Sequence, residues 1–182
     1  MKWKVVLTAL MLAITLSAYG EKPPAGKATA PEKIKISEQK LLTLRMKGPY
    51  QLMNKAFGEV YMAMGKLGLR PAGTPFAIYF NNPTKVKPAE YDWEVCVPVD
   101  RKAKPKAPVK FRIQKAMEAV SLVYTGPYGT KEHTGCYSKL IAFGSSLKGY
   151  ISGPPREVYH EMKGFQGGKK NVTQIYFPVE KK

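Results

Sequence analysis

The amino-acid sequence predicts an α+β fold made of two pseudo-symmetric strand-helix-strand-strand repeats. The chain repeats itself, and each copy carries alternating apolar runs on either side of one helical period. The repeated segments, which recur 78 to 80 residues apart, are 48–50 with 126–128, 75–79 with 155–159, and 95–99 with 175–179. We expect one antiparallel sheet with both helices on one face and a central ligand cleft between the repeats.

Residues 41–99 form the first predicted repeat. An alternating apolar strand precedes the turn Gly48-Pro49-Tyr50, and apolar residues at helical spacing then continue to Gly68. The expected elements are a strand over 42–46, a helix over 51–67, and strands over 76–80 and 93–99.

Residues 111–179 form the second predicted repeat, in the same order. Thr130 stands where a side-chain N-cap would begin the helix, whose apolar stripe extends to Leu147. Strands are expected over 120–124, 157–162 and 173–179. Between the repeats, residues 100–110 carry a basic run that we interpret as a solvated linker.

The N-terminal residues 1–20 have the pattern of a signal peptide: a basic start, an apolar run over residues 5–16 and small residues before the cleavage point. We expect cleavage after Gly20 and export to the periplasm or beyond, with an uncleaved membrane anchor as the alternative. Residues 21–40 are rich in Lys, Pro and Ala, which predicts a flexible leader that packs against nothing.

The formal net charge of +17 favours anionic surfaces. Nucleic acid is excluded as an expected partner, because no helix-turn-helix or zinc-finger spacing is present. An anionic envelope surface remains a possible partner. The chain has two histidines, His133 and His160, and we assign His160 with Val158 to the side away from the predicted groove, so haem is not expected. We expect no metal and no cofactor. The protein is expected to be a monomer or a homodimer.

Side-chain alternation sorts the strand residues into two faces. We assign Phe76 and Ile78 to an apolar face beneath the helices, together with Val95, Val97, Ile175 and Phe177. The opposite face is aromatic and polar, which suits a ligand groove. Its members are Ala77, Tyr79, Glu94, Cys96, Glu157, Tyr159, Gln174 and Tyr176.

These motifs resemble the GyrI-like small-molecule-binding domains, which also occur as effector-binding domains of AraC-type and other multidrug-sensing regulators. The resemblance covers residues 41–179 and rests on the Gly-Pro-Tyr turns, a Pro-x-Glu-x-Tyr strand at 155–159, and apolar-Pro-apolar triplets at 97–99 and 177–179. It implies a pseudo-symmetric fold whose central cleft takes hydrophobic, often cationic ligands, with a cleft glutamate that falls on Glu157. Some members of that family act as hydrolases.

Glu157 is the leading candidate for a site residue. Its counterpart in the first repeat is Ala77, so a carboxylate stands where the repeat needs only a small residue. A carboxylate in an aromatic groove is costly to desolvate without a partner, and a ligand cation over tyrosine rings would be such a partner. The alternative is a Glu157 paired with a nearby Lys or Arg.

Further candidates share the predicted groove. Tyr79 and Tyr159 should meet at the pseudo-axis, and Tyr176 and Trp93 are expected to line the pocket with them. Glu94 would supply a second carboxylate for a hydrolase, with Glu157 as its acid or base partner; an exposed strand edge is the alternative.

The chain has two cysteines, in a setting predicted to be oxidising. Cys96 is assigned to the groove, whereas Cys136 lies on the helix stripe that faces the sheet. Free thiols are therefore favoured over a disulfide.

We expect an exported protein that captures a hydrophobic, cationic small molecule between its repeats. A small-molecule hydrolase and a basic module that docks on anionic envelope components stay open as alternatives.

Overall fold

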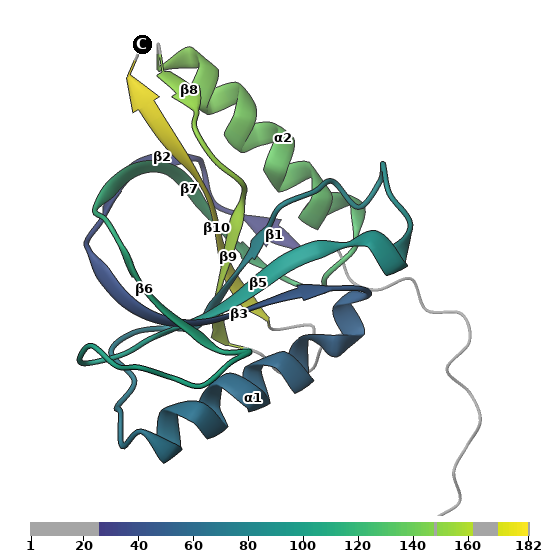
Figure 1. The fold of residues 1–182 in the computed structure, drawn as a ribbon. Helices are drawn as coiled ribbons and strands as arrows, with labels where there is room; N and C mark the ends of the chain where they lie inside the picture. The colour runs from purple at the N-terminus through teal and green to yellow at the C-terminus, as the bar shows by residue number, and fades with distance from the viewer. Residues whose placement is uncertain (1–25, 148, 162–170, 182) are drawn as a thin grey trace, which may run out of the picture.

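The chain folds around one curved antiparallel sheet with two helices on one of its faces (Figure 1). The computed structural model describes residues 26–147, 149–161 and 171–181. The helices are α1 (Met53–Lys66) and α2 (Lys131–Ser146), with short 3-10 helices η1 (Tyr50–Leu52) and η2 (Pro88–Glu90). The strands are β1 (Lys27–Ala28), β2 (Glu32–Ile36), β3 (Gln39–Lys47), β4 (Phe76–Tyr79), β5 (Asp92–Pro98), β6 (Lys110–Gln114), β7 (Met117–Thr125), β8 (Gly149–Ile151), β9 (Arg156–Glu161) and β10 (Val172–Lys181).

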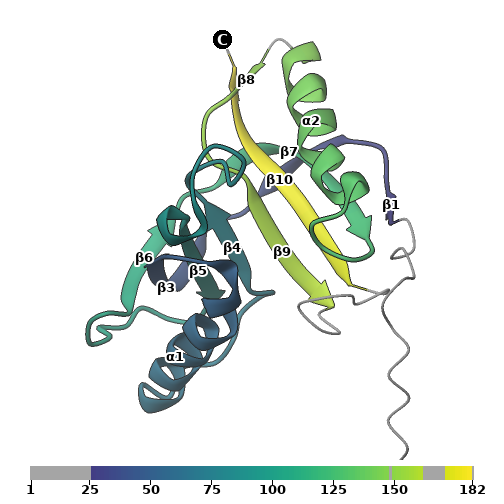
Figure 2. The same cartoon turned by 90° about the vertical axis from the view of Figure 1, so that its right-hand side faces the viewer.

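The order of the strands shows the internal repeat. Along the described sheet it runs β1-β7-β10-β9-β4-β5-β3-β6, with β2 beside β7 and β8 beside β10. Strands β4 and β9 meet antiparallel at its centre, where Ala77 lies opposite Glu157. Since these residues are equivalent in the two repeats, the pseudo-twofold axis passes through this pair. Figure 2 shows α1 over the first repeat and α2 over the second, which confirms the predicted α+β fold.

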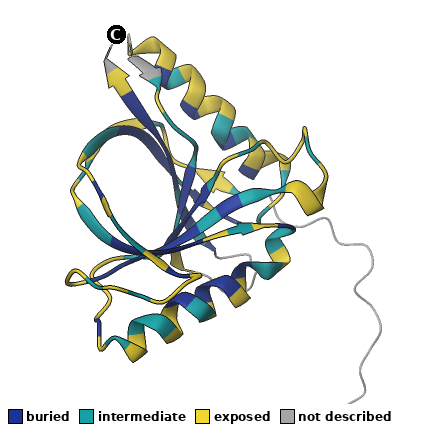
Figure 3. Ribbon diagram, viewed as in Figure 1, coloured by how far each residue is buried: buried dark blue, intermediate teal, exposed yellow. Residues whose placement is uncertain are grey.

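Each helix buries one stripe of side chains against the sheet (Figure 3). The stripes are equivalent in the two repeats: Met53, Ala56, Phe57 and Val60 in α1, and His133, Cys136, Leu140 and Gly144 in α2. The predicted N-cap is confirmed, because the Thr130 hydroxyl accepts a hydrogen bond from the backbone N–H of His133 at 3.2 Å. Leu147 lies outside the stripe and is 42% exposed.

The predicted flexible leader is wrong from residue 27 onward. Strands β1 and β2 both pair with β7, and Ile34 lies opposite Ala119. Strand β2 lies 78 residues before β6, and each of the two pairs with the first long strand of the other repeat. The sequence did carry a signal, because Ile34 and Ile36 alternate with lysines at the strand period.

The predicted division of the sheet into an apolar face and a groove face is also wrong. Alternation is correct within each strand, but it does not fix how the strands match one another. Ala77 lies opposite both Val95 and Glu157, so all three side chains point to the helix face. Phe76 and Ile78 belong to the other face, where they form a second core cluster with Leu41 and Cys96. Both faces are therefore buried, which is why apolarity alone misled the assignment.

The predicted signal peptide over residues 1–20, its cleavage after Gly20 and the alternative of an uncleaved membrane anchor all lie outside the described residues. Among the described helices, neither is long and apolar enough to cross a membrane.

The turn at Gly126 gives the first testable prediction. Its φ is +151°, and a Cβ added there would lie 2.7 Å from both the Gly26 Cα and the Tyr124 hydroxyl. We expect Gly126→Ala to lower the free energy of unfolding by about 1–3 kcal/mol, measured by urea denaturation. Gly135→Ala is the control, because a Cβ in that part of α2 meets nothing within 4 Å. Gly135→Ala should raise the free energy of unfolding by about 0.5–1 kcal/mol. If both variants lower the free energy of unfolding equally, the backbone at Gly126 does not require glycine.

Candidate functional site

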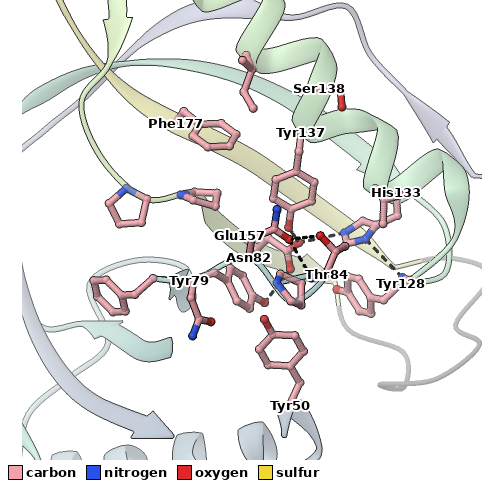
Figure 4. Close-up of a pocket in the computed structure, with 18 of the residues that line it drawn as sticks. Tyr50, Tyr79, Asn82, Thr84, Tyr128, His133, Tyr137, Ser138, Glu157 and Phe177 are labelled. Atoms are coloured by element: carbon pink, nitrogen blue, oxygen red, sulfur yellow. Dashed lines mark hydrogen bonds and ion pairs between the residues drawn. The ribbon is translucent and has the colours of Figure 1, made fainter. Parts of the chain in front are cut away.

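A pocket of about 780 Å³ lies on the helix face of the sheet, above the centre where the repeats meet (Figure 4). Strands β4 and β9 form its floor, α2 one wall, and the loop after β4 another. Its main lining residues are Tyr50, Tyr79, Phe80, Asn81, Asn82, Pro83, Thr84, Tyr128, His133, Thr134, Tyr137, Ser138, Ile141, Glu157, Tyr159 and Phe177. The predicted cleft at the seam between the repeats is thus present.

The Glu157 side chain is the centre of this pocket, although only 3% of the residue is exposed. The Tyr137 hydroxyl, from α2, donates a hydrogen bond to its Oε1 atom. The Tyr79 hydroxyl, from β4, donates to its Oε2 atom at 3.0 Å. Hydroxyl groups from both repeats therefore hold the carboxylate on the pseudo-axis.

Tyr79 and Tyr159 meet as the repeat predicts. Their hydroxyl oxygens lie 2.6 Å apart, and the Tyr159 hydroxyl also lies 3.3 Å from the Met53 sulfur. Burial raises the pKa of Tyr79, Tyr137 and Tyr159 well above the ordinary value, and the charge of Glu157 raises it further. These hydroxyls consequently stay protonated and serve as donors.

His133 is a site residue that the sequence analysis missed. Its Nε2 atom lies 3.0 Å from Oε1 of Glu157, within ion-pair distance but off the line of a well-formed N–H hydrogen bond. The backbone N–H of Gly129 donates to Nδ1 at 3.4 Å, which assigns the proton of the neutral ring to Nε2. Glu157 therefore pairs with a histidine, and no Lys or Arg in the described residues forms an ion pair with it.

Burial alone would raise the pKa of Glu157, but the contacts from His133, Tyr137 and Tyr79 outweigh it and hold the pKa below the ordinary value of 4.5. Glu157 is therefore ionised at neutral pH.

This lowered pKa predicts how stability depends on pH. A depressed folded-state pKa contributes stability that is present above the ordinary value and is lost as the pH falls through the folded value. The difference in unfolding free energy between the wild type and Glu157→Gln should therefore shrink as the pH falls below 4.5. Urea denaturation at neutral pH and at about pH 3 measures it. A difference that grows in acid would contradict the ionised state.

The two repeats differ systematically in the polarity of this site. Eighty residues separate Met53 from His133, Phe57 from Tyr137 and Ala77 from Glu157. In each pair the first repeat supplies an apolar side chain and the second a polar one. Extending the repeat alignment into the helices would have found His133 and Tyr137 from the sequence.

Aromatic rings from both Gly-Pro-Tyr turns complete the pocket. Tyr50 packs edge-on against Tyr79, with ring centroids 5.3 Å apart, and stacks on Tyr91 at 4.6 Å. Tyr128 packs edge-on against Tyr159 at 6.3 Å and donates or accepts a hydrogen bond with Thr173. Burial raises the pKa of Tyr128 to about 12. The walls are thus neutral rings around one carboxylate.

Four predicted site residues lie outside the pocket. Trp93 is fully buried below Tyr50, and its indole N–H donates to the Gly48 carbonyl at 2.8 Å. The other three lie on the far face of the sheet, as their strand register requires: Glu94, Cys96 and Tyr176.

Glu94 and the cysteines have their own surroundings. Glu94 accepts a hydrogen bond from Arg112 at 2.7 Å, and it lies on the opposite face of the sheet from Glu157. Cys96 and Cys136 are free thiols in different core clusters, and burial raises the pKa of both. The described residues contain no group of three His, Cys, Asp or Glu side chains that could hold a metal ion.

Comparisons with known proteins agree with this architecture. A family model, the GyrI-like small molecule binding domain, matches residues 29–180. No curated protein sequence matches the chain.

Several solved structures have a similar fold. One is the C-terminal domain of EcmrR (TM-score 0.71, 23% identity, 84% of this chain and 98% of that chain). Another is a hydrolase from Listeria innocua (TM-score 0.66, 14% identity, 83% of this chain and 92% of that chain). A third is SAV2435 bound to tetraphenylphosphonium (TM-score 0.52, 10% identity, 84% of this chain and 94% of that chain). At these identities the similarity concerns the fold alone.

Proposed function

The chain belongs to the GyrI-like small-molecule-binding domain family, and we propose that it captures a hydrophobic cation in the pocket around Glu157. The observation that carries this proposal is a buried, ionised carboxylate on the floor of an aromatic pocket. Its charge faces tyrosine hydroxyls and one histidine, and no Lys or Arg of the described residues pairs with it, so a ligand cation can serve as its counter-charge.

The tyrosine rings support the same ligand class. A cation within about 6 Å of an aromatic ring centroid is attracted by the ring's negative face. Tyr50, Tyr79, Tyr128 and Tyr159 all line the pocket, whose volume of about 780 Å³ suits a ligand of drug size. The structural neighbour SAV2435 has been solved with such a cation, tetraphenylphosphonium.

We also propose that this capture takes place outside the cytoplasm, after export of the chain. The support is the signal-peptide pattern of residues 1–20. N-terminal sequencing of the protein from the periplasmic fraction tests this proposal. The expected result is a mature chain that begins at Glu21.

Calorimetry with two probes of the same shape tests the ligand class. Tetraphenylphosphonium carries a positive charge and tetraphenylborate a negative one, so their difference in affinity isolates charge from hydrophobic burial. We expect the cation to bind at least tenfold more tightly, about 1.4 kcal/mol. Equal affinities, or preference for the borate, would reject a cation site.

The hydrolase alternative loses its second carboxylate, because Glu94 lies on the opposite face and pairs with Arg112. Glu157 with its tyrosines remains a constellation that can move a proton. Incubation with a panel of carboxylic esters distinguishes the two functions: turnover that disappears in Glu157→Gln would indicate an enzyme, and binding without turnover a carrier.

A further inference from the structure

The segment between the repeats is a structured part of the surface rather than a loose linker. Residues 100–109 contain no regular element, yet Val109 is 5% exposed and both Val109 and Ala103 pack in the core cluster that α1 covers. Figures 1 and 2 both show this segment beside α1. Its path is therefore fixed by buried contacts at two points.

Its attachment to α1 is also polar. The Arg101 guanidinium donates to the Gly68 carbonyl at 2.6 Å, just beyond the C-terminus of α1, and forms an ion pair with Asp100 at 2.9 Å. The backbone N–H of Arg70 donates to the same Asp100 carboxylate at 3.1 Å. The Asp100 carboxylate therefore already has two partners, Arg101 and the backbone of Arg70.

The lysines of this segment point the other way. Lys102, Lys104 and Lys106 are exposed and alternate with the partly buried Ala103 and Pro105. None of the three lysines forms an ion pair with any described residue. The alternation of exposed lysines with partly buried residues places the three lysines on the same, outward side of the segment, where they form a row.

We propose that this row, the basic ridge of Lys102, Lys104 and Lys106, docks the protein on an anionic lipid surface. The two exposed residues Lys66 and Arg70, near the C-terminus of α1, extend the positive region beside it. Lysine ammonium groups close to an anionic bilayer each contribute about fivefold in affinity. Small residues separate the lysines, with no exposed ring on which a base could stack, so lipid head groups fit the ridge better than nucleic acid.

The ridge and the pocket are separate sites. Tyr50 lies just before α1 and Arg101 contacts the chain just after it, and the 14 residues of α1 span roughly 21 Å. Docking therefore goes beyond the proposed function and leaves the pocket free. The two can be tested independently.

Co-sedimentation with vesicles of phosphatidylcholine and phosphatidylglycerol in equal parts tests the proposal. The triple variant Lys102→Gln, Lys104→Gln, Lys106→Gln should lose on the order of a hundredfold in partitioning. The control Lys85→Gln, Lys131→Gln, Lys139→Gln removes the same charge from exposed positions elsewhere and should lose less than about tenfold. Wild-type binding should also vanish at high salt.

Three outcomes would overturn it: equal losses in both triple variants, equal wild-type binding to pure phosphatidylcholine vesicles, or tighter wild-type binding to a DNA duplex than to the anionic vesicles at the same salt. Tetraphenylphosphonium binding and the circular dichroism spectrum show that each variant is folded.

Discussion

Glu157→Gln should weaken tetraphenylphosphonium binding about 30-fold or more. The carboxylate is buried in the pocket, and removing one member of a buried charge pair costs about 2–5 kcal/mol. Gln keeps the size of the side chain and an oxygen that can accept the hydroxyl of Tyr137 or Tyr79. The loss should therefore be in affinity, measured by calorimetry at neutral pH, with the fold retained.

Glu94→Gln is the matched control for this variant. It makes the same chemical change, but on the opposite face of the sheet, where the carboxylate is paired with Arg112. Its affinity for the cation should stay within about twofold of the wild type. If the two variants bind equally, the pocket carboxylate is not the anchor of the ligand.

Ala77→Glu should be the most destabilising substitution at the pseudo-axis. Ala77 is fully buried and lies directly opposite Glu157, so the variant places a second carboxylate beside an ionised one in a site without a spare cation. An unpaired buried charge costs about 3–5 kcal/mol. Ala77→Gln has nearly the same shape without the charge, and the difference between the two variants isolates the electrostatic cost.

The pH dependence of this difference has a definite sign. Burial and repulsion by Glu157 raise the folded-state pKa of the new carboxyl. The penalty is therefore full above that raised pKa, shrinks as the pH falls through it, and is gone below the ordinary value of about 4.3. Urea denaturation of both variants across this range is the measurement. Equal unfolding free energies for Ala77→Glu and Ala77→Gln at neutral pH would show that the site beside Glu157 is more open to water than the structure indicates.

The centre of the site could be predicted from the sequence because the duplication supplies its own reference. Ala77 shows that a small apolar residue is enough for the fold at that position, so the carboxylate of Glu157 at the equivalent position indicates a function. The same comparison predicted that Tyr79 and Tyr159 meet, and their hydroxyls do. Duplication therefore predicts both the architecture and the position of the axis.

The matching of one strand with the next could not be obtained this way. Alternation shows that neighbouring side chains within a strand point to opposite faces, but it does not show which of the two sets points toward the helices. Here both faces of the sheet are buried, so apolarity does not decide between them. Glu94 and Cys96 were assigned to the groove for this reason. Register, which depends on cross-strand pairing far apart in sequence, places them on the far face.

His133 was missed for a different reason. A lone histidine on an amphipathic helix does not stand out by itself, and only the comparison with Met53, its equivalent in the first repeat, marks it in the sequence. Its partner follows from the approach of α2 to β9, where Nε2 lies 3.0 Å from Oε1 of Glu157. The strand β2 was missed because its isoleucines are embedded among lysines in a Pro-rich segment, and its partner β7 lies more than 80 residues away.

The central claim is that a hydrophobic cation binds over the Glu157 carboxylate, among tyrosine rings from both repeats. A crystal structure of the protein with tetraphenylphosphonium tests it most directly. We expect density for one cation in the pocket. Its phosphorus should lie over the Glu157 carboxylate, and its phenyl groups should pack on the rings of Tyr50, Tyr79 and Tyr128. Density for the cation elsewhere, with the pocket unchanged, would contradict the claim.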